Sequence, residues 1–130
     1  MGVTEHVGQR LLGALNDDGR AIRGSRILLL GVAYKRNIDD TRESPAGRLL
    51  KLLEVKGARV SYHDPFVAEY HGRKSTPLTA ETLRNCDGVL IVTDHEKVDY
   101  ALVGEHAPLV VDTRNVMAAL GDVKARVVRA

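Results

Sequence analysis

Residues 31–43 concentrate more ionisable chemistry than a simple connection between two structural elements needs. Lys35 is a compact positive charge on a flexible stem, which suits a phosphate group reached by a side chain. Arg42 carries a planar guanidinium, which can bind a planar anion through two parallel hydrogen bonds. The same segment also holds Tyr34, Arg36, Asp39, Asp40 and Glu43. Residue types of this kind predict a binding site for an anionic ligand.

A further cation is Arg114, which follows the apolar run 109–111 after one aspartate and one threonine. If this run and the one before Lys35 are strands of one parallel sheet, their carboxyl ends lie at the same edge, where open α/β sheets bind ligands. The two cations would then converge on one crevice and could neutralise a diphosphate. Plainer explanations stay open: Lys35 can be an ordinary solvated lysine. Residues 39–43 can be a turn-forming charge cluster, whose exposed ion pairs contribute under ~1 kcal/mol each.

Alternating strands and helices are expected to position these side chains. The run at 26–31, which ends at Gly31, is typical of a strand buried on both faces. Further strands are predicted at 59–63, which the turn pair Asp64-Pro65 ends, at 88–92, at 109–111 and, as a short edge strand, at 127–128. Helical spacing and capping residues predict helices at 4–15, 44–56, 79–84 and 100–106, with a helical turn at 116–120. The predicted fold class is α/β, a Rossmann-like three-layer domain with an open parallel sheet, preceded by an N-terminal helix.

Capping and turn residues refine these boundaries. Ser44 is expected to cap the second helix, with Pro45 at its first position and Gly57 closing it in the left-handed conformation. Thr79 offers a polar group at the start of the third helix. Residues 67–77 are polar and are predicted to be irregular.

The dinucleotide fingerprint G-x-G-x-x-G, which a nucleotide-binding α/β fold often carries after its first strand, is absent. Gly31 is followed by Val32, Ala33 and Tyr34, so a close approach of backbone to a pyrophosphate is not provided for. Phosphate binding here would therefore have to use side chains such as Lys35.

Composition excludes several classes of function. A formal net charge of +2 without a run of basic residues does not favour nucleic acid. No apolar stretch approaches the ~20 residues that span a bilayer, and the N-terminus lacks the pattern of a secretory signal. The single cysteine, Cys86, rules out an internal disulfide and suits a reducing cytoplasm.

Catalytic and metal-binding patterns are not visible. Cys86 has no His or Lys at a spacing that would activate it, so it is expected to be a packed residue rather than a nucleophile. No metal-ligand spacing is found among the histidines, which are expected at the surface or the core edge: His6, His63, His71, His95 and His106. The residues alone therefore predict a binding domain without catalytic machinery or a metal.

The helix predicted at 4–15 has no strand before it, which is an unusual start for a doubly wound domain. It suggests that the chain begins partway through a larger protein. A small domain that simply opens with a helix is the alternative.

The sequence also resembles a known family. Residues 31–46, G-V-A-Y-K-R-N-I-D-D-T-R-E-S-P-A, closely resemble the signature of the C-terminal, UDP-binding domain of the UDP-glucose/GDP-mannose dehydrogenase family. Three segments support it: G-A-R-V-S-Y-H-D-P (57–65), D-G-V-L-I-V-T-D-H (87–95) and V-V-D-T-R-N (110–115). The H-D-P and V-T-D-H motifs most resemble those of the branch that oxidises UDP-N-acetylated hexosamines.

The resemblance implies a fragment of an enzyme. Family members oxidise the sugar C6 alcohol to a carboxylate in two NAD-linked steps, through a thioester on a cysteine of their central part. It implies that residues 1–22 are the tail of a central helical region and a linker, and that 23–130 form the UDP-sugar-binding domain. NAD would be bound mainly by an N-terminal domain absent here, and the full-length protein is expected to be a homodimer. Cys86 lies outside the family's G-G-x-C-x-P-K-D context, so no catalytic residue is expected and the chain alone should be inactive.

The resemblance also assigns roles position by position. Tyr34 and Lys35 match the aromatic-lysine pair that binds the UDP-sugar, and Arg114 matches an arginine that contacts the nucleotide substrate. Arg42 matches the arginine that reaches across to NAD. The neighbouring acidic residues Asp39, Asp40 and Glu43 are expected to orient Arg42 and the loop. The expected substrate is UDP-glucose or a UDP-N-acetyl-hexosamine, and the alternative is a stand-alone nucleotide- or phosphate-binding regulatory module.

Overall fold

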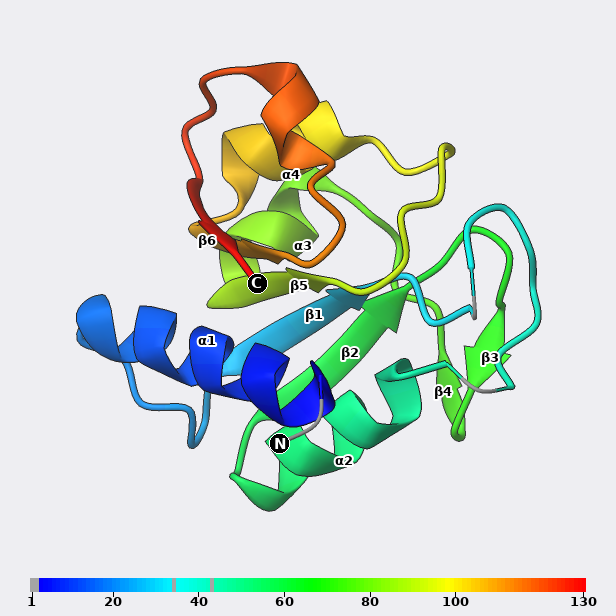
Figure 1. Ribbon diagram of the computed structural model, residues 1–130, viewed down its shortest axis with the longest axis horizontal. Helices are drawn as coiled ribbons and strands as arrows, with labels where there is room; N and C mark the ends of the chain where they lie inside the picture. Colours follow the sequence, from blue (N-terminus) through cyan, green and yellow to red (C-terminus); the bar gives the residue numbers. More distant parts are fainter. Residues whose placement is uncertain (1–2, 34, 43) are drawn as a thin grey trace.

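The computed structural model describes residues 3–33, 35–42 and 44–130, and a five-stranded sheet forms its centre (Figure 1). The strand order is β2-β1-β5-β6-β7, and every neighbouring pair is parallel. The bounds are Arg26–Leu30 (β1), Arg59–His63 (β2), Gly88–Ile91 (β5), Leu109–Asp112 (β6) and Arg126–Arg129 (β7). The five predicted strands are therefore confirmed, with β7 at an edge of the sheet as expected.

Helices cover both faces of this sheet. Helices α1 (Val3–Asp17) and α2 (Ala46–Val55) belong to one apolar cluster. The opposite cluster holds α3 (Ala80–Asn85), α4 (Tyr100–His106) and the 3-10 helix η1 (Met117–Leu120). The predicted three-layer α/β fold with a leading N-terminal helix is confirmed, and the turn expected at 116–120 is this 3-10 helix.

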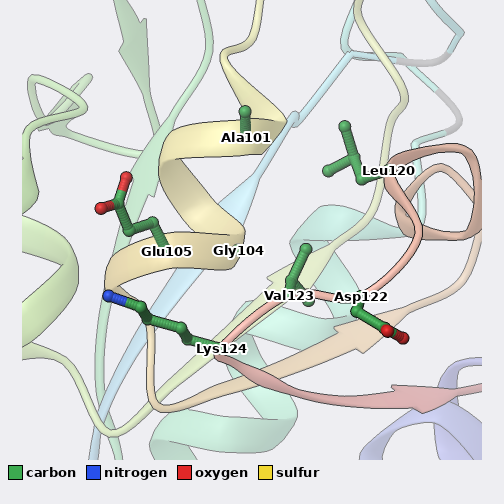
Figure 2. Close-up of a pocket in the computed structure, with 7 residues that line it drawn as sticks. All are labelled: Ala101, Gly104, Glu105, Leu120, Asp122, Val123 and Lys124. Atoms are coloured by element: carbon green, nitrogen blue, oxygen red, sulfur yellow. The ribbon is translucent and has the colours of Figure 1, made fainter.

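The α3–α4 layer encloses the second apolar cluster and a cavity at its outer side. Leu28 and Leu30 of β1 pack there with Leu83 of α3 and Val103 of α4. A cavity of about 280 Å³ lies between α4 and the segment that leads into β7 (Figure 2). Its lining residues are Ala101, Gly104, Glu105, Leu120, Asp122, Val123 and Lys124.

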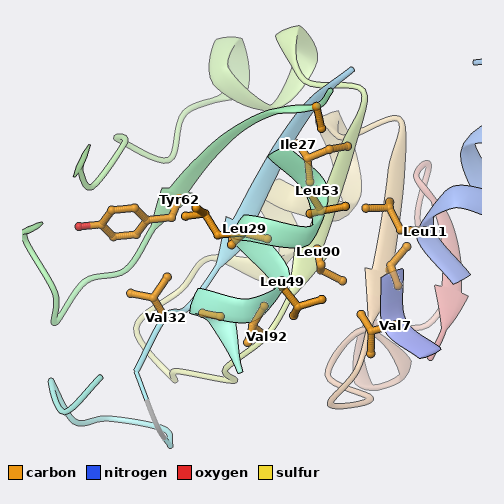
Figure 3. Packing of buried hydrophobic residues seen from close by; sticks show 14 of the residues in the cluster. Val7, Leu11, Ile27, Leu29, Val32, Leu49, Leu53, Tyr62, Leu90 and Val92 are labelled. Atoms are coloured by element: carbon orange, nitrogen blue, oxygen red, sulfur yellow. The ribbon is translucent and has the colours of Figure 1, made fainter. Parts of the chain in front are cut away.

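The α1–α2 layer buries the other face of the same strands. Successive side chains of a strand point to opposite faces, so Ile27 and Leu29 of β1 belong to this side. Figure 3 shows them with Leu53 of α2 and Leu11 of α1. Leu29, Leu11 and Leu53 are fully buried, and burial of one such side chain stabilises the fold by roughly 1.5–3 kcal/mol.

The prediction that residues 67–77 are irregular is wrong. They include a small antiparallel hairpin of β3 (Glu69–Tyr70) and β4 (Arg73–Lys74). The two residues between the strands, His71 (φ 51°) and Gly72 (φ 76°), both have positive φ, the conformation that a tight hairpin turn needs. Strands of two residues are too short to show an alternating pattern, which is why the sequence did not reveal them.

The start of α2 also differs from the prediction by one position. Pro45 is the N-cap residue rather than the first helical residue, and its side chain makes no capping hydrogen bond. The Ser44 hydroxyl instead accepts a hydrogen bond from the Ala46 N–H at 3.2 Å. Two other expectations are confirmed: Gly57 ends α2 with φ 95°, and Thr79 caps α3 by accepting from the Thr82 N–H.

Gly31 lies where β1 ends and passes close to the segment after β5. Its φ is 82°, and a Cβ placed on it would lie 2.5 Å from the Thr93 Cβ and 2.6 Å from the Thr93 carbonyl oxygen. The neighbour is partly backbone, which cannot rotate away. Only glycine therefore allows the chain to leave β1 in this direction.

We predict that Gly31→Ala lowers the free energy of unfolding by roughly 2–5 kcal/mol, from a left-handed alanine plus overpacking. Gly19→Ala is the matched control, since Gly19 has a similar φ of 74° but open space around it. That control should cost only the conformational part, about 1–2 kcal/mol. Urea unfolding of the two variants tests this, and equal losses would contradict the close approach of Gly31 to Thr93.

Candidate functional site

The chain reverses direction across the sheet between β1 and β5. From β1 it passes through α2 to β2 on one side, and it later returns to β5 on the other side of β1. Such a reversal separates the loops that leave the carboxyl ends of the two strands, and open α/β sheets bind ligands at this point. Figure 1 shows the long loop between β1 and α2 projecting beyond the sheet on the side of the β3–β4 hairpin.

The structure brings the segments of Lys35 and Arg114 to the same side of the sheet, where the carboxyl ends of the parallel strands lie. Lys35 follows β1 and Arg114 follows β6, and the parallel strand β5 lies between them. The Arg114 Nε donates a hydrogen bond to the Val92 carbonyl oxygen at 3.1 Å, at the end of β5. The Val92 N–H in turn donates to the Leu30 carbonyl oxygen of β1 at 2.9 Å. The guanidinium group thus lies over the strand next to β1.

A buried carboxylate fixes the backbone that carries Arg114. Asp112, the last residue of β6, accepts hydrogen bonds from the Arg114 N–H and the Met117 N–H, both at 2.9 Å. Asp112 is 2% exposed. The loop after β6 is therefore held tightly while the Arg114 residue itself stays exposed to solvent.

Lys35 and Arg114 keep their charge available to a ligand. Lys35 is exposed, and within residues 3–33, 35–42 and 44–130 neither cation forms an ion pair with a carboxylate. Tyr34, the aromatic member of the predicted pair, lies outside the described residues.

The other cations of the loop are paired with acids. Arg36 lies 3.1 Å from the Asp94 carboxylate and 3.7 Å from that of Glu96. Arg42 binds Asp40 through two side-chain hydrogen bonds, at 3.1 and 3.0 Å, and its N–H also donates to Asp40. These hydrogen bonds lower the pKa of Asp40.

Arg42 is therefore a surface residue held by its neighbour. Its side chain is 87% exposed, so it lies apart from the buried network of the loop and is open to a second molecule or domain. The expectation that acidic neighbours orient Arg42 holds for Asp40. Asp39 is exposed, and Glu43 lies outside the described residues.

Two buried polar residues at the same edge were not predicted as site residues. Asp64 follows β2 and His95 follows β5, and their side chains are both fully buried, 2.9 Å apart. His95 was expected at the surface or core edge, which is wrong for this histidine. The only sequence signal for Asp64 and His95 was that they belong to the H-D-P and V-T-D-H motifs.

Cys86 lies at the opposite edge of the sheet, just before β5 begins. Its thiol donates to the Leu83 carbonyl oxygen at 3.1 Å, and burial raises its pKa to about 11. A thiol of this kind is not a nucleophile at neutral pH, so the expectation of a packed residue is confirmed.

The described part of the chain contains no cluster of three or more His, Cys, Asp or Glu side chains suited to a metal ion. Among the helices described, none combines the length and apolar character needed to cross a membrane. The cavity beside α4 is lined by none of the residues predicted to form the site (Figure 2).

Comparison with known proteins agrees with this arrangement. Residues 28–119 match the UDP binding domain of the UDP-glucose/GDP-mannose dehydrogenase family. UDP-N-acetyl-D-mannosamine dehydrogenase of Methanococcus maripaludis is 32% identical over 104 residues, which cover 74% of this chain and 24% of that protein. UDP-glucose 6-dehydrogenase of Rhizobium meliloti is 32% identical over 120 residues, which cover 85% of this chain and 27% of that protein.

A solved structure extends the match to the fold. The crystal structure of NDP-N-acetyl-D-galactosaminuronic acid dehydrogenase from Methanosarcina mazei superposes with a TM-score of 0.79 at 26% identity. It covers 98% of this chain, which corresponds to 28% of that protein. The chain thus spans about a quarter of the length of the curated relatives above. By its motifs, its sheet and these matches, the chain belongs to the UDP-glucose/GDP-mannose dehydrogenase family and corresponds to its UDP binding domain.

Proposed function

We propose that this chain binds the UDP part of a nucleotide sugar, with Lys35 and Arg114 against the diphosphate and Tyr34 as a further substrate-binding residue. The observation that carries the proposal is the pair of exposed cations at the ends of β1 and β6, on either side of the point where the chain reverses. A diphosphate is recognised mainly by such positive side chains when backbone N–H groups are not available.

The backbone N–H groups after β1 are in fact occupied. The Val32 and Ala33 N–H groups donate to the Asp64 Oδ2 at 2.9 and 3.3 Å. In a glycine-rich dinucleotide loop the equivalent groups face the pyrophosphate. Here a buried carboxylate takes the place of a ligand oxygen, so this loop does not fit the pyrophosphate of NAD. We therefore assign NAD to another domain and the side chains of this loop to the UDP-sugar.

For the whole protein we infer an NAD-dependent oxidation of the sugar C6 alcohol to a carboxylate. In this proposal residues 23–130 bind the UDP-sugar, and 1–22 continue a central helical region. An N-terminal domain binds NAD, and Arg42, which Asp40 holds at the surface, reaches that NAD. The chain then contributes orientation of the substrate rather than a bond-making residue. UDP-glucose and UDP-N-acetyl-hexosamines are the candidate substrates, since relatives named for both kinds match.

We also propose an oligomeric state and a cellular location for the full-length protein. The full-length protein is inferred to be a homodimer in the cytoplasm, where NAD is available and a lone thiol such as Cys86 stays reduced.

We predict that the chain binds UDP in a calorimetric titration and that Lys35→Ala and Arg114→Ala each weaken binding. Loss of a charge-assisted hydrogen bond costs about 1.5–3 kcal/mol, which corresponds to roughly 10- to 100-fold in affinity. Both side chains are exposed, so the free energy of unfolding should change by no more than about 1 kcal/mol.

Lys51→Ala removes an equally exposed positive charge from α2 and is the matched control, with unchanged affinity expected. Variants of Lys35 and Arg114 that bind as well as the parent chain would refute the site. A parent chain that does not bind millimolar UDP would refute the proposed function.

We also predict that the isolated chain forms no NADH from NAD and UDP-glucose or a UDP-N-acetyl-hexosamine. The described residues offer no activated cysteine, because Cys86 is buried with a raised pKa at the far edge of the sheet. Measurable NADH formation that persists after repeated purification would contradict the proposal that this chain binds the substrate and that catalysis needs another domain.

A further inference from the structure

Residues 32–37, the first part of the loop between β1 and α2, are fastened at both ends by buried side chains that follow β2 and β5. At its start, the Val32 and Ala33 N–H groups donate to Asp64. At its end, the Asn37 N–H donates to the His95 Nδ1 at 2.7 Å. Lys35 lies in the chain between these two fastened points.

Asp64 is the acceptor on which this arrangement is built. Its Oδ2 receives the Val32, Ala33 and His95 donors, and its Oδ1 accepts from the Phe66 N–H at 2.8 Å. A fully buried carboxylate is costly unless several donors compensate its lost hydration, and four donors do so here. Rearrangement of the loop would remove two of them.

His95 connects Asp64 to Asn37, at the end of the segment 32–37. A backbone N–H can only donate, so the hydrogen bond from Asn37 requires an unprotonated Nδ1. The ring proton then resides on Nε2, which donates to Asp64 at 2.9 Å. One neutral imidazole therefore connects Asp64 to Asn37.

Neighbouring groups contact both the ring and the backbone of His95. The Phe66 ring packs against it, with 4.8 Å between ring centroids. The Tyr100 hydroxyl donates to the His95 carbonyl oxygen at 2.9 Å, and burial raises the pKa of Tyr100, which keeps this donor protonated.

Asn37 itself is in the left-handed conformation, with φ 62°. Its side-chain oxygen accepts a hydrogen bond from the Glu96 N–H at 3.0 Å. This is a second hydrogen bond between Asn37 and the segment after β5.

We propose that Asp64 and His95 are positioning residues for the anion-binding site, because they fix the loop so that Lys35 is held ready for the diphosphate. Neither side chain is accessible to the ligand, so both act through the backbone of the loop. A loop ordered before binding avoids the entropy cost of ordering it on binding. The inference rests on the proposed function for its ligand, but the order of the loop can be tested without any ligand.

Two variants of His95 separate this role from general stabilisation. His95→Asn keeps an oxygen at the position of Nδ1 and loses the donor to Asp64. His95→Gln keeps an N–H at the position of Nε2 and loses the acceptor for Asn37. Each removes one hydrogen bond, so a merely structural pair would give similar losses of stability and similar UDP affinities.

We predict that the Asn37 amide exchanges with solvent roughly 3- to 10-fold faster in His95→Gln than in His95→Asn, measured by NMR without ligand. UDP affinity should fall in the same order and by a similar factor. His106→Gln, at the end of α4, is the control and should change neither quantity. Asn37→Ala, at an exposed position, should weaken UDP binding without disturbing the buried pair, which keeps the test decisive if a His95 variant does not fold.

Equal Asn37 exchange rates in the two His95 variants would overturn the anchoring. Faster exchange with unchanged UDP affinity would overturn the positioning role. If the parent chain does not bind UDP at all, the proposed function fails, and the exchange rates alone then decide whether Asp64 and His95 anchor the loop.

Discussion

The Asp64 carboxylate accepts hydrogen bonds from two consecutive backbone N–H groups at the end of β1, in the place where a related fold would accept a phosphate oxygen. A protein carboxylate thus occupies the position of a ligand oxygen, and this has two consequences. It ties the first residues of the loop to the residue that follows β2. It also leaves phosphate recognition to positive side chains, because the nearest backbone donors are already used.

The charges of the site divide into two groups that serve different purposes. Arg36 and Arg42 are paired with acids of the same edge and stabilise or present the loop. Lys35 and Arg114 have no carboxylate partner within residues 3–33, 35–42 and 44–130. The buried Asp112 accepts from the Arg114 N–H, and the buried Asp64 accepts from the N–H groups of Val32 and Ala33, which precede Lys35 in the chain. Two buried acids thus lie close in the chain or in space to two exposed cations, which follow β1 and β6 on either side of β5. The positive charges of Lys35 and Arg114 are therefore not neutralised by any carboxylate of the described residues.

Most of the fold could be predicted because its signals are local. The apolar run that Gly31 ends and the turn pair Asp64-Pro65 indicated the first two strands of the sheet, and Gly57 and Thr79 marked helix ends. The β3–β4 hairpin was missed because two-residue strands carry no period. The Asp40–Arg42 contact joins residues two apart and was foreseen, whereas the His95–Asn37 bond joins residues 58 apart. Contacts of that kind depend on strand order, which a single sequence does not specify, so the anchoring of the loop emerged only from the structure.

The central claim is that side-chain cations at the ends of β1 and β6 bind the diphosphate while Asp64 keeps the backbone N–H groups. A crystal structure of this chain with UDP bound tests it most directly. The account predicts that the diphosphate oxygens lie within hydrogen-bonding distance of the Lys35 Nζ and the Arg114 guanidinium, with Val32 and Ala33 still donating to Asp64. A diphosphate bound to those two N–H groups, or seated in the cavity beside α4, would contradict it.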